Sequence, residues 1–271
     1  MMNEDFLKEL SMYDRCSCQG GYKGEEKPRG RIDVSRMIRR LDACFDANDL
    51  EEAVRVLEYW HKEALALNDL RGELSVVSEA LGLYRKTGNE KAALSAVSRA
   101  KAIIDALEME STLSAATVLL NAATTLKAFG HAEEGLPLYE RAFAVYSRDL
   151  EKDDERLGGF YNNYGLALAD LSRKEEAESA FFSALEIMEK KGKGLLEGAV
   201  THLNLAHLYE LWQDEKIYPH LISAYELLLS PTIAHNGYFI FTLGKCIPSF
   251  RHFGLTEEAA VLSALEKGEA I

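Results

Sequence analysis

Residues 164–184, YGLALADLSRKEEAESAFFSA, contain the pattern that decides the fold. Residues three and four positions apart lie on one face of an α-helix, so apolar residues at that spacing mark a helix with a buried side. A short polar segment around Ser172 separates two such sets. The stretch therefore predicts two helices joined by a tight turn. The two sets are Tyr164, Gly165 and Leu168, followed by Ala177, Phe181 and Ala184.

The same pattern recurs along the chain at a nearly constant period. Matching segments start at Ala80, Ala122, Tyr164 and Leu205, so that successive starts differ by 42, 42 and 41 residues. Self-similarity at a period of this length is typical of proteins built from stacked helix pairs. The turn positions repeat in the same register, which predicts six repeats between Ile32 and Gly268. The turn residues are Asn48, Gly88, Gly130, Ser172 and Gly254.

Small residues recur five positions after the turn. A small side chain at this position lets the second helix of a pair approach another helix closely. A single helix pair cannot bury both of its faces, but stacked pairs bury them against one another. The sequence therefore predicts an all-α fold, an α-solenoid of about six antiparallel helix pairs. The small residues are Ala93, Gly135, Ala177 and Ala259.

Composition and charge limit the function classes. The chain has 271 residues and a net charge of −13, which disfavours phosphate backbones and anionic lipid as partners. The first ten residues contain no apolar signal segment, and the apolar stretch Tyr238–Leu243 is too short to span a membrane. Four cysteines without framework spacing indicate a reducing compartment. We therefore expect a cytoplasmic protein that binds neither nucleic acid nor membranes.

The repeats leave residues 1–31 unassigned, and we expect them to form a flexible tail before one repeat domain at 32–271. Cys16 and Cys18 in this tail are a weak metal signal, since structural zinc needs four ligands. Cys44 and Cys246 fall on predicted helices as small core residues. Pro248 lies inside the first helix of the sixth predicted repeat, where it should kink or break the helix and make that repeat irregular.

The sequence offers no recognisable catalytic or cofactor-binding motif. The HExxH, GxxxxGK[ST], GxGxxG and GxSxG patterns are absent, and the seven histidines are scattered. Pairs of glutamates open several predicted second helices, where they complement the helix dipole. We therefore predict no enzyme, no cofactor and no metal site.

Asn121, Asn163 and Asn204 occupy one equivalent position in three successive first helices, 42 and 41 residues apart. Asparagine is a poor helix former, so its repetition inside helices indicates a function. Helical spacing extends this column into a polar stripe that is distinct from the buried one. The stripe is Thr117, Asn121, Thr124 and Ala128 in the third repeat, Gly159, Asn163, Leu166 and Asp170 in the fourth, and Val200, Asn204, His207 and Leu211 in the fifth.

The repeats resemble tetratricopeptide repeats, in particular the longer ones of the kinesin-light-chain type and of bacterial peptide-sensing regulators. Asn163, Tyr164, Gly165 and Leu168 match the family pattern in its first helix. The resemblance implies a right-handed superhelix whose first helices line a concave groove for a protein or extended peptide. Asparagine amides there can bond to a peptide backbone, although they could instead bond to neighbouring helices. The predicted groove residues are Asn121, Asn162, Asn163, Asn204, Thr117, Thr124, His207, Glu79, Arg85 and Lys127.

The function that we expect is that of a protein-binding or peptide-binding adaptor. One alternative is a receptor for a small signalling peptide that acts through a separate output protein, because 31 residues are too few for a helix-turn-helix domain. A second alternative is a self-associating scaffold that docks through Tyr238–Leu243. The partner, the pathway and the oligomeric state stay open at the level of sequence.

Overall fold

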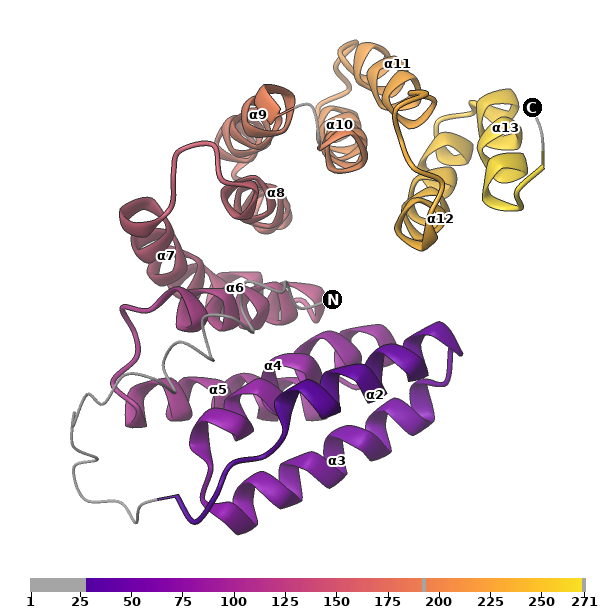
Figure 1. The fold of residues 1–271 in the computed structure, drawn as a ribbon. Coiled ribbons are helices and arrows are strands. Elements are labelled where there is room, and N and C mark those ends of the chain that lie inside the picture. The colour runs from indigo at the N-terminus through magenta and orange to yellow at the C-terminus, as the bar shows by residue number, and fades with distance from the viewer. Residues whose placement is uncertain (1–27, 192–193, 270–271) are drawn as a thin grey trace. The chain divides into compact units, whose positions relative to one another are not determined.

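The computed structural model describes residues 28–191 and 194–269, and all regular secondary structure in these ranges is helical. The helices form six consecutive pairs, coloured in chain order in Figure 1. The first helix of each pair is called an A helix and the second a B helix. The pairs are α2 (Val34–Asp46) with α3 (Leu50–Leu67), α4 (Leu70–Thr87) with α5 (Glu90–Ala106), α6 (Leu113–Ala128) with α7 (Ala132–Asp149), α8 (Glu155–Asp170) with α9 (Lys174–Lys191), α10 (Leu195–Glu210) with α11 (Ile217–Leu228), and α12 (Gly237–His252) with α13 (Thr256–Glu266).

The chain divides into two compact units, Met1–Asp149 and Leu150–Ile271. In the first unit the A helices α2, α4 and α6 contact one another in that order, and each packs on its own B helix. In the second unit α8, α10 and α12 do the same. The prediction of six antiparallel helix pairs of the α-solenoid type is confirmed.

The turn inside each pair has the same backbone design. One residue with a left-handed φ follows the A helix, and the N–H of the next residue donates to the carbonyl five positions earlier, as in His131 to Leu126 and Arg173 to Leu168, both at 2.9 Å. This is the Schellman arrangement, which satisfies carbonyls that a helix end leaves without partners. The six left-handed residues are Asn48, Gly88, Gly130, Ser172, Gln213 and Gly254.

Five of these turn residues were predicted, and Gln213 was not. Glutamine is not among the residues that favour a left-handed φ, so the sequence carries no local signal for it. Its φ of 55° nevertheless matches that of the other turns. The stacking of the helices therefore imposes this conformation on a residue that does not prefer it.

The small residues after the turns lie at close helix contacts, as predicted. Ala93 and Ala177 have no exposed surface, and a Cβ atom on Gly135 would lie 3.1 Å from the carbonyl oxygen of Ala123. The fifth pair departs from this rule. Its equivalent residue is Tyr218, which is 62% exposed. The reason is that α11 begins later after its turn than the other B helices do, and that it is shorter than α9, the preceding B helix of the same unit.

A buried carboxylate ties the second pair to its neighbour. Glu73 of α4 is 1% exposed and accepts two 2.6 Å bonds from the guanidinium of Arg99 on α5. His61 of α3 contacts the same carboxylate at 3.1 Å. A buried charge is tolerated when it is paired and fully bonded, so this cluster fixes three helices of the first unit.

The prediction was that Pro248 kinks or breaks the last A helix, and the break does not occur. Helix α12 continues through Pro248 to His252, and α13 completes a regular sixth pair. Pro248 lacks the N–H that would bond to Gly244, but Cys246, Ile247 and Phe250 are almost fully buried in the C-terminal core. Their packing outweighs the lost backbone bond, because most helix stability in proteins comes from tertiary contacts.

The cysteines of the helices are placed as predicted: Cys44 and Cys246 are free, buried thiols. Cys16 and Cys18 lie outside the described residues, as does most of the predicted tail at 1–31. At the end of that segment, the Arg29 N–H donates to the Leu67 carbonyl at 2.7 Å. Among the described helices, none is long and apolar enough to cross a membrane.

Replacing Gly130 with alanine tests the turn design. No atom lies within 4 Å of the position where the new Cβ would stand, so the substitution adds only the strain of a left-handed alanine at φ 83°. We expect the free energy of unfolding to fall by about 1 kcal/mol. Ser172→Gly should act in the opposite direction, because it relieves the same strain at φ 59°. Denaturant unfolding measures both changes in the free energy of unfolding. If the two variants change it in the same direction, the left-handed turn residue is not the source of the strain.

Replacing Ala177 with leucine tests the close helix contact. The added side chain has no space between α8 and α9, so we expect destabilisation by about 1–3 kcal/mol and a lower melting temperature. The matched control is Ser179→Leu, two residues away on the exposed side of α9. A wild-type melting curve for Ala177→Leu would show that the register of the pair is misassigned.

Candidate functional site

The predicted polar stripe is the partly exposed side of its A helices. On α6, the residues Asn121 and Thr124 are partly exposed, whereas Ala122 and Ala123 between them are completely buried. On α10, Asn204 and His207 are partly exposed, whereas Leu205 and Ala206 are buried. We call this surface the helix-A face, considered separately in each unit. Its residues are Thr117, Asn121 and Thr124 on α6, Gly159, Asn163 and Leu166 on α8, and Val200, Asn204 and His207 on α10.

The side-chain amide of Asn121 makes no hydrogen bond to any described residue. The one bond that this residue's polar groups make to the described residues outside the helix ladder is at its backbone carbonyl, which accepts a 2.7 Å bond from the Thr125 hydroxyl. An amide has two donors and two acceptor lone pairs, and leaving them unmet in a half-buried position is unfavourable. Asn121 is therefore the member of the column with the full capacity of its amide available to a ligand.

The asparagines of the second unit are partly used within the protein. Asn204 donates at 2.9 Å to the side-chain oxygen of Asn162, which also accepts a 3.3 Å bond from Thr201. Asn163 donates at 2.9 Å to the carbonyl of Gly159 in its own helix. Of these two asparagines, only Asn204 bonds to a neighbouring helix, and the Asn163 bond stays within α8. The side-chain oxygens of Asn163 and Asn204 keep their acceptor capacity.

The two threonines of the stripe hold their helix pair together. Thr117 and Tyr146 lie 2.9 Å apart through their oxygens, and Thr124 and Tyr139 lie 3.3 Å apart. Both tyrosines are buried on α7. Both hydroxyls also donate to carbonyls of their own helix, Thr117 to Leu113 and Thr124 to Leu120, so these residues have little hydrogen-bonding capacity left for a ligand.

Two of the predicted charged residues lie on α4, the A helix that contacts α6 in the first unit. Burial, with a contribution from the nearby Asp42, raises the pKa of Glu79 on α4 to about 7. This carboxyl is therefore partly protonated at neutral pH and can donate as well as accept. Burial also lowers the pKa of the Arg85 guanidinium, which has no ion-pair partner among the described residues. Lys127, the third predicted charge, is partly exposed at the end of α6.

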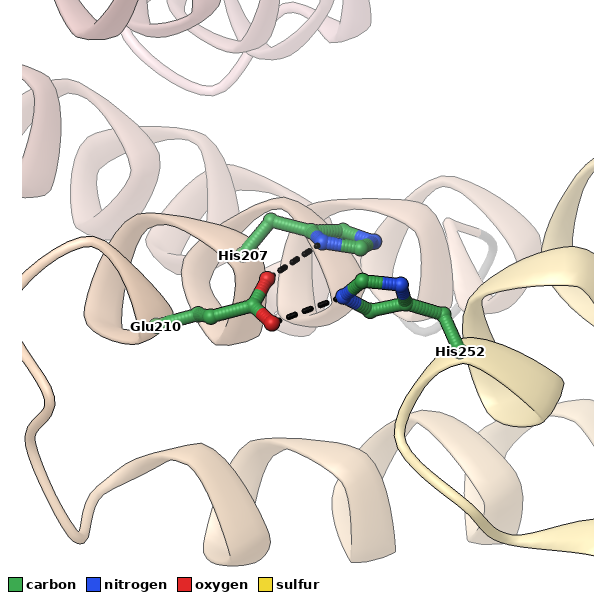
Figure 2. A group of neighbouring side chains, drawn as sticks. All are labelled: His207, Glu210 and His252. Carbon is green, nitrogen blue, oxygen red and sulfur yellow. Dashed lines mark hydrogen bonds and ion pairs between the residues drawn. The ribbon is translucent and has the colours of Figure 1, made fainter.

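A cluster that the sequence analysis missed lies in the second unit. His207 and Glu210 are one turn apart on α10, and His252 is the last residue of α12. The Glu210 carboxylate lies 2.7 Å from His252 Nε2 and 3.5 Å from His207 Nδ1. Figure 2 shows both rings directed toward this carboxylate. The signal that could have revealed the cluster is the repeat itself, because Glu210 and His252 are 42 residues apart.

Contacts at one repeat period recur through the structure. Asn162 with Asn204 and His207 with Ser249 are each separated by 42 residues, and Glu197 with Tyr238 by 41. Each bond joins consecutive A helices of one unit. The period therefore brings equivalent side chains together, and the polar residues along an A-helix column interact with one another.

Comparison with known proteins agrees with this geometry. A family model described as "Tetratricopeptide repeat" matches residues 114–190, which span α6 to α9. No curated protein sequence matches the chain significantly.

Several solved structures are similar to this chain. The structure of BtubC (BKLC) from P. vanneervenii is 16% identical, with a TM-score of 0.50, and the match covers 85% of this chain and 89% of that chain. A Podosopora anserina putative kinesin light chain with nearly identical TPR-like repeats is 15% identical over 72% of this chain and 93% of its own, with a TM-score of 0.49. The MamA RS-1 ArsTM double mutant is 16% identical over 73% of this chain and 96% of its own, also with a TM-score of 0.49. The first of these likenesses establishes the fold.

The bond between Asn162 and Asn204 generates a stability prediction. Asn162→Ala removes the acceptor and leaves a half-buried donor unmet, so we expect the free energy of unfolding to fall by about 1 kcal/mol. Asn121→Ala, which breaks no side-chain bond, should leave stability within about 0.5 kcal/mol of wild type. A double-mutant cycle on Asn162 and Asn204 should give a favourable coupling energy, and strict additivity would show that the bond contributes nothing.

Proposed function

We propose that this chain, whose residues 114–190 match the tetratricopeptide-repeat family, is an adaptor that binds another protein through an extended segment. The binding surface is the helix-A face, taken unit by unit: in the first unit the amide of Asn121 meets the backbone of that segment, and in the second unit the amides of Asn163 and Asn204 offer the same kind of contact. The observation that carries this proposal is the amide of Asn121, which is partly exposed and unbonded within the described structure.

Hydrogen-bonding capacity explains why an extended segment suits this surface. An extended backbone presents N–H and C=O groups at regular intervals, and an asparagine side chain can bond to both kinds at once. Asn121 offers its whole amide, whereas Asn163 and Asn204 each offer an oxygen and one remaining N–H. Such contacts are independent of the partner's side chains, so they provide affinity without specifying sequence.

Specificity would come from the charged and apolar groups beside the amides. On the first unit these are Glu79, with its raised pKa, and the unpaired guanidinium of Arg85. An acidic side chain on the partner would form an ion pair with this guanidinium and so offset the energetic cost of burying its charge. Leu166 on α8 and Val200 on α10 offer partly exposed apolar surface to the partner on the second unit.

The fold supports a binding role over a catalytic one, since stacked helix pairs provide an extended surface for contact with another chain. We also propose that this role is cytoplasmic. The free thiols of Cys44 and Cys246 accord with a reducing compartment, and the net charge of −13 favours proteins over nucleic acid as partners.

Peptide selection with an alanine series tests the proposed surface. A random peptide library displayed on phage is selected on the immobilised full chain, and a selected peptide is then titrated by fluorescence anisotropy. We expect Asn121→Ala to weaken binding about tenfold, the effect of losing one or two hydrogen bonds. The double variant Asn163→Ala/Asn204→Ala tests the helix-A face of the second unit in the same way.

The matched controls are Ser98→Ala on α5 and Ser179→Ala on α9, which remove polar groups from exposed positions of B helices. They should leave the affinity unchanged. Circular dichroism confirms that each variant is folded. If the asparagine variants bind the peptide as wild type does, the partner occupies another surface.

A further inference from the structure

We propose that His207, Glu210 and His252 form a binding site for a Zn²⁺ ion in the second unit. The inference does not depend on the partner-binding proposal, although His207 also belongs to the helix-A face, because it rests on three side chains that already converge. Each residue offers one ligand atom, and these three atoms lie within 4.8 Å of one another. Figure 2 shows that both imidazoles direct a nitrogen toward the two carboxylate oxygens.

The distances fit a tetrahedral site after small side-chain movements. With metal–ligand bonds of about 2.1 Å, two ligand atoms of a tetrahedral zinc lie about 3.4 Å apart. The Glu210–His207 pair is at 3.5 Å, the Glu210–His252 pair at 2.7 Å, and no pair exceeds 4.8 Å. The three side chains are 41%, 42% and 52% exposed, so they have room to shift by the required amount.

A neighbouring hydroxyl selects the nitrogen that His207 would use. Its Nε2 lies 3.0 Å from the Ser249 hydroxyl, which belongs to α12, the helix that carries His252. Donation of the Nε2 proton to this oxygen leaves the lone pair on Nδ1, the atom that faces Glu210. Metal-binding histidines in proteins are oriented by such a bond on their other nitrogen.

The helices that carry the three ligand residues are fixed by packing in the hydrophobic core. Ala206, next to His207, and Phe250, near His252, have no exposed surface and belong to one buried cluster with Leu203 and Leu243. The ring of Phe253 packs against both histidines, with centroids 4.8 Å from His207 and 4.9 Å from His252. Ligands on packed helices are already near their bound positions, so binding requires little ordering.

The chemistry of the ligands identifies the kind of metal. Two imidazoles and one carboxylate suit borderline metals such as Zn²⁺, whereas Mg²⁺ and Ca²⁺ prefer sets of oxygen atoms. Three protein ligands leave a coordination position for water or for a group from another molecule. A bound ion would also cross-link α10 to α12 and thereby stabilise the second unit.

Calorimetric titration of the tag-free full chain with ZnCl₂ tests the site, with Co²⁺ absorption as a report on coordination geometry. We expect one Zn²⁺ per chain, no competition by Mg²⁺, and a higher melting temperature with zinc. The double variant H207Q/H252Q should lose this binding, and Ser249→Ala should weaken it about tenfold. Circular dichroism checks that the variants keep their helices.

The controls separate this site from other histidines. His220 pairs with His202 through Nδ1 atoms 2.8 Å apart, and His131 lies between Glu90 and Glu134. His220→Gln and His131→Gln should bind zinc as wild type does. The proposal is overturned if wild type shows no saturable one-to-one binding, or if H207Q/H252Q binds zinc equally well. Unchanged binding by Ser249→Ala would contradict the assignment of Nδ1 as the ligand atom of His207.

Discussion

The close pairing of two helices across a Schellman turn is the constraint on which the rest of the structure depends. Each turn closes with one left-handed residue, and a small residue five positions later allows the helices to touch, as Gly135 does against Ala123. Because the pairs share this geometry, their lengths are nearly equal and the period stays at 40–42 residues from one turn to the next. The period then decides which side chains of successive A helices meet.

Much of the fold is predictable because these constraints act through residue types with strong preferences. Gly88 and Gly130 mark their turns in the sequence, since glycine tolerates the left-handed φ that the turn requires. Gln213 adopts the same φ without any such preference, so only the register of the neighbouring repeats could have located it. Pro248 shows the converse, because the burial of Ile247 and Phe250 maintains a helix that local rules would end.

The candidate site is only partly predictable from sequence. The separation of the stripe from the core was predictable, because helical periodicity distinguishes the two faces of each helix. The bonding within it was not, because Asn204 meets Asn162 and not the equivalent Asn163. Which of two adjacent side chains reaches the next helix depends on the rotation of the helices, and the spacing of residues does not encode this. For the same reason, the 42-residue spacing of Glu210 and His252 places them at equivalent positions of neighbouring A helices but does not show that their side chains meet.

These contacts divide the polar residues of the A helices into two groups. Asn162 and Ser249 bond to the next or preceding A helix and contribute to the packing of repeats. Asn121 has no such partner in the described structure, and Glu79 is held where its pKa rises to about 7. Polar groups that a fold places at a surface without satisfying them are the ones that a ligand can satisfy.

The most direct measurement of the central claim follows the side-chain amide resonances of ¹⁵N-labelled asparagine while a selected peptide is added. Asn121, Asn163 and Asn204 lie on the helix-A face, whereas Asn48, Asn68 and Asn89 lie in turns and serve as internal references. The account predicts that the Asn121 amide signal in the first unit shifts with a peptide bound there, while the signals of the turn asparagines stay in place. Shifts confined to the turn asparagines, or binding without a shift at Asn121, would contradict it.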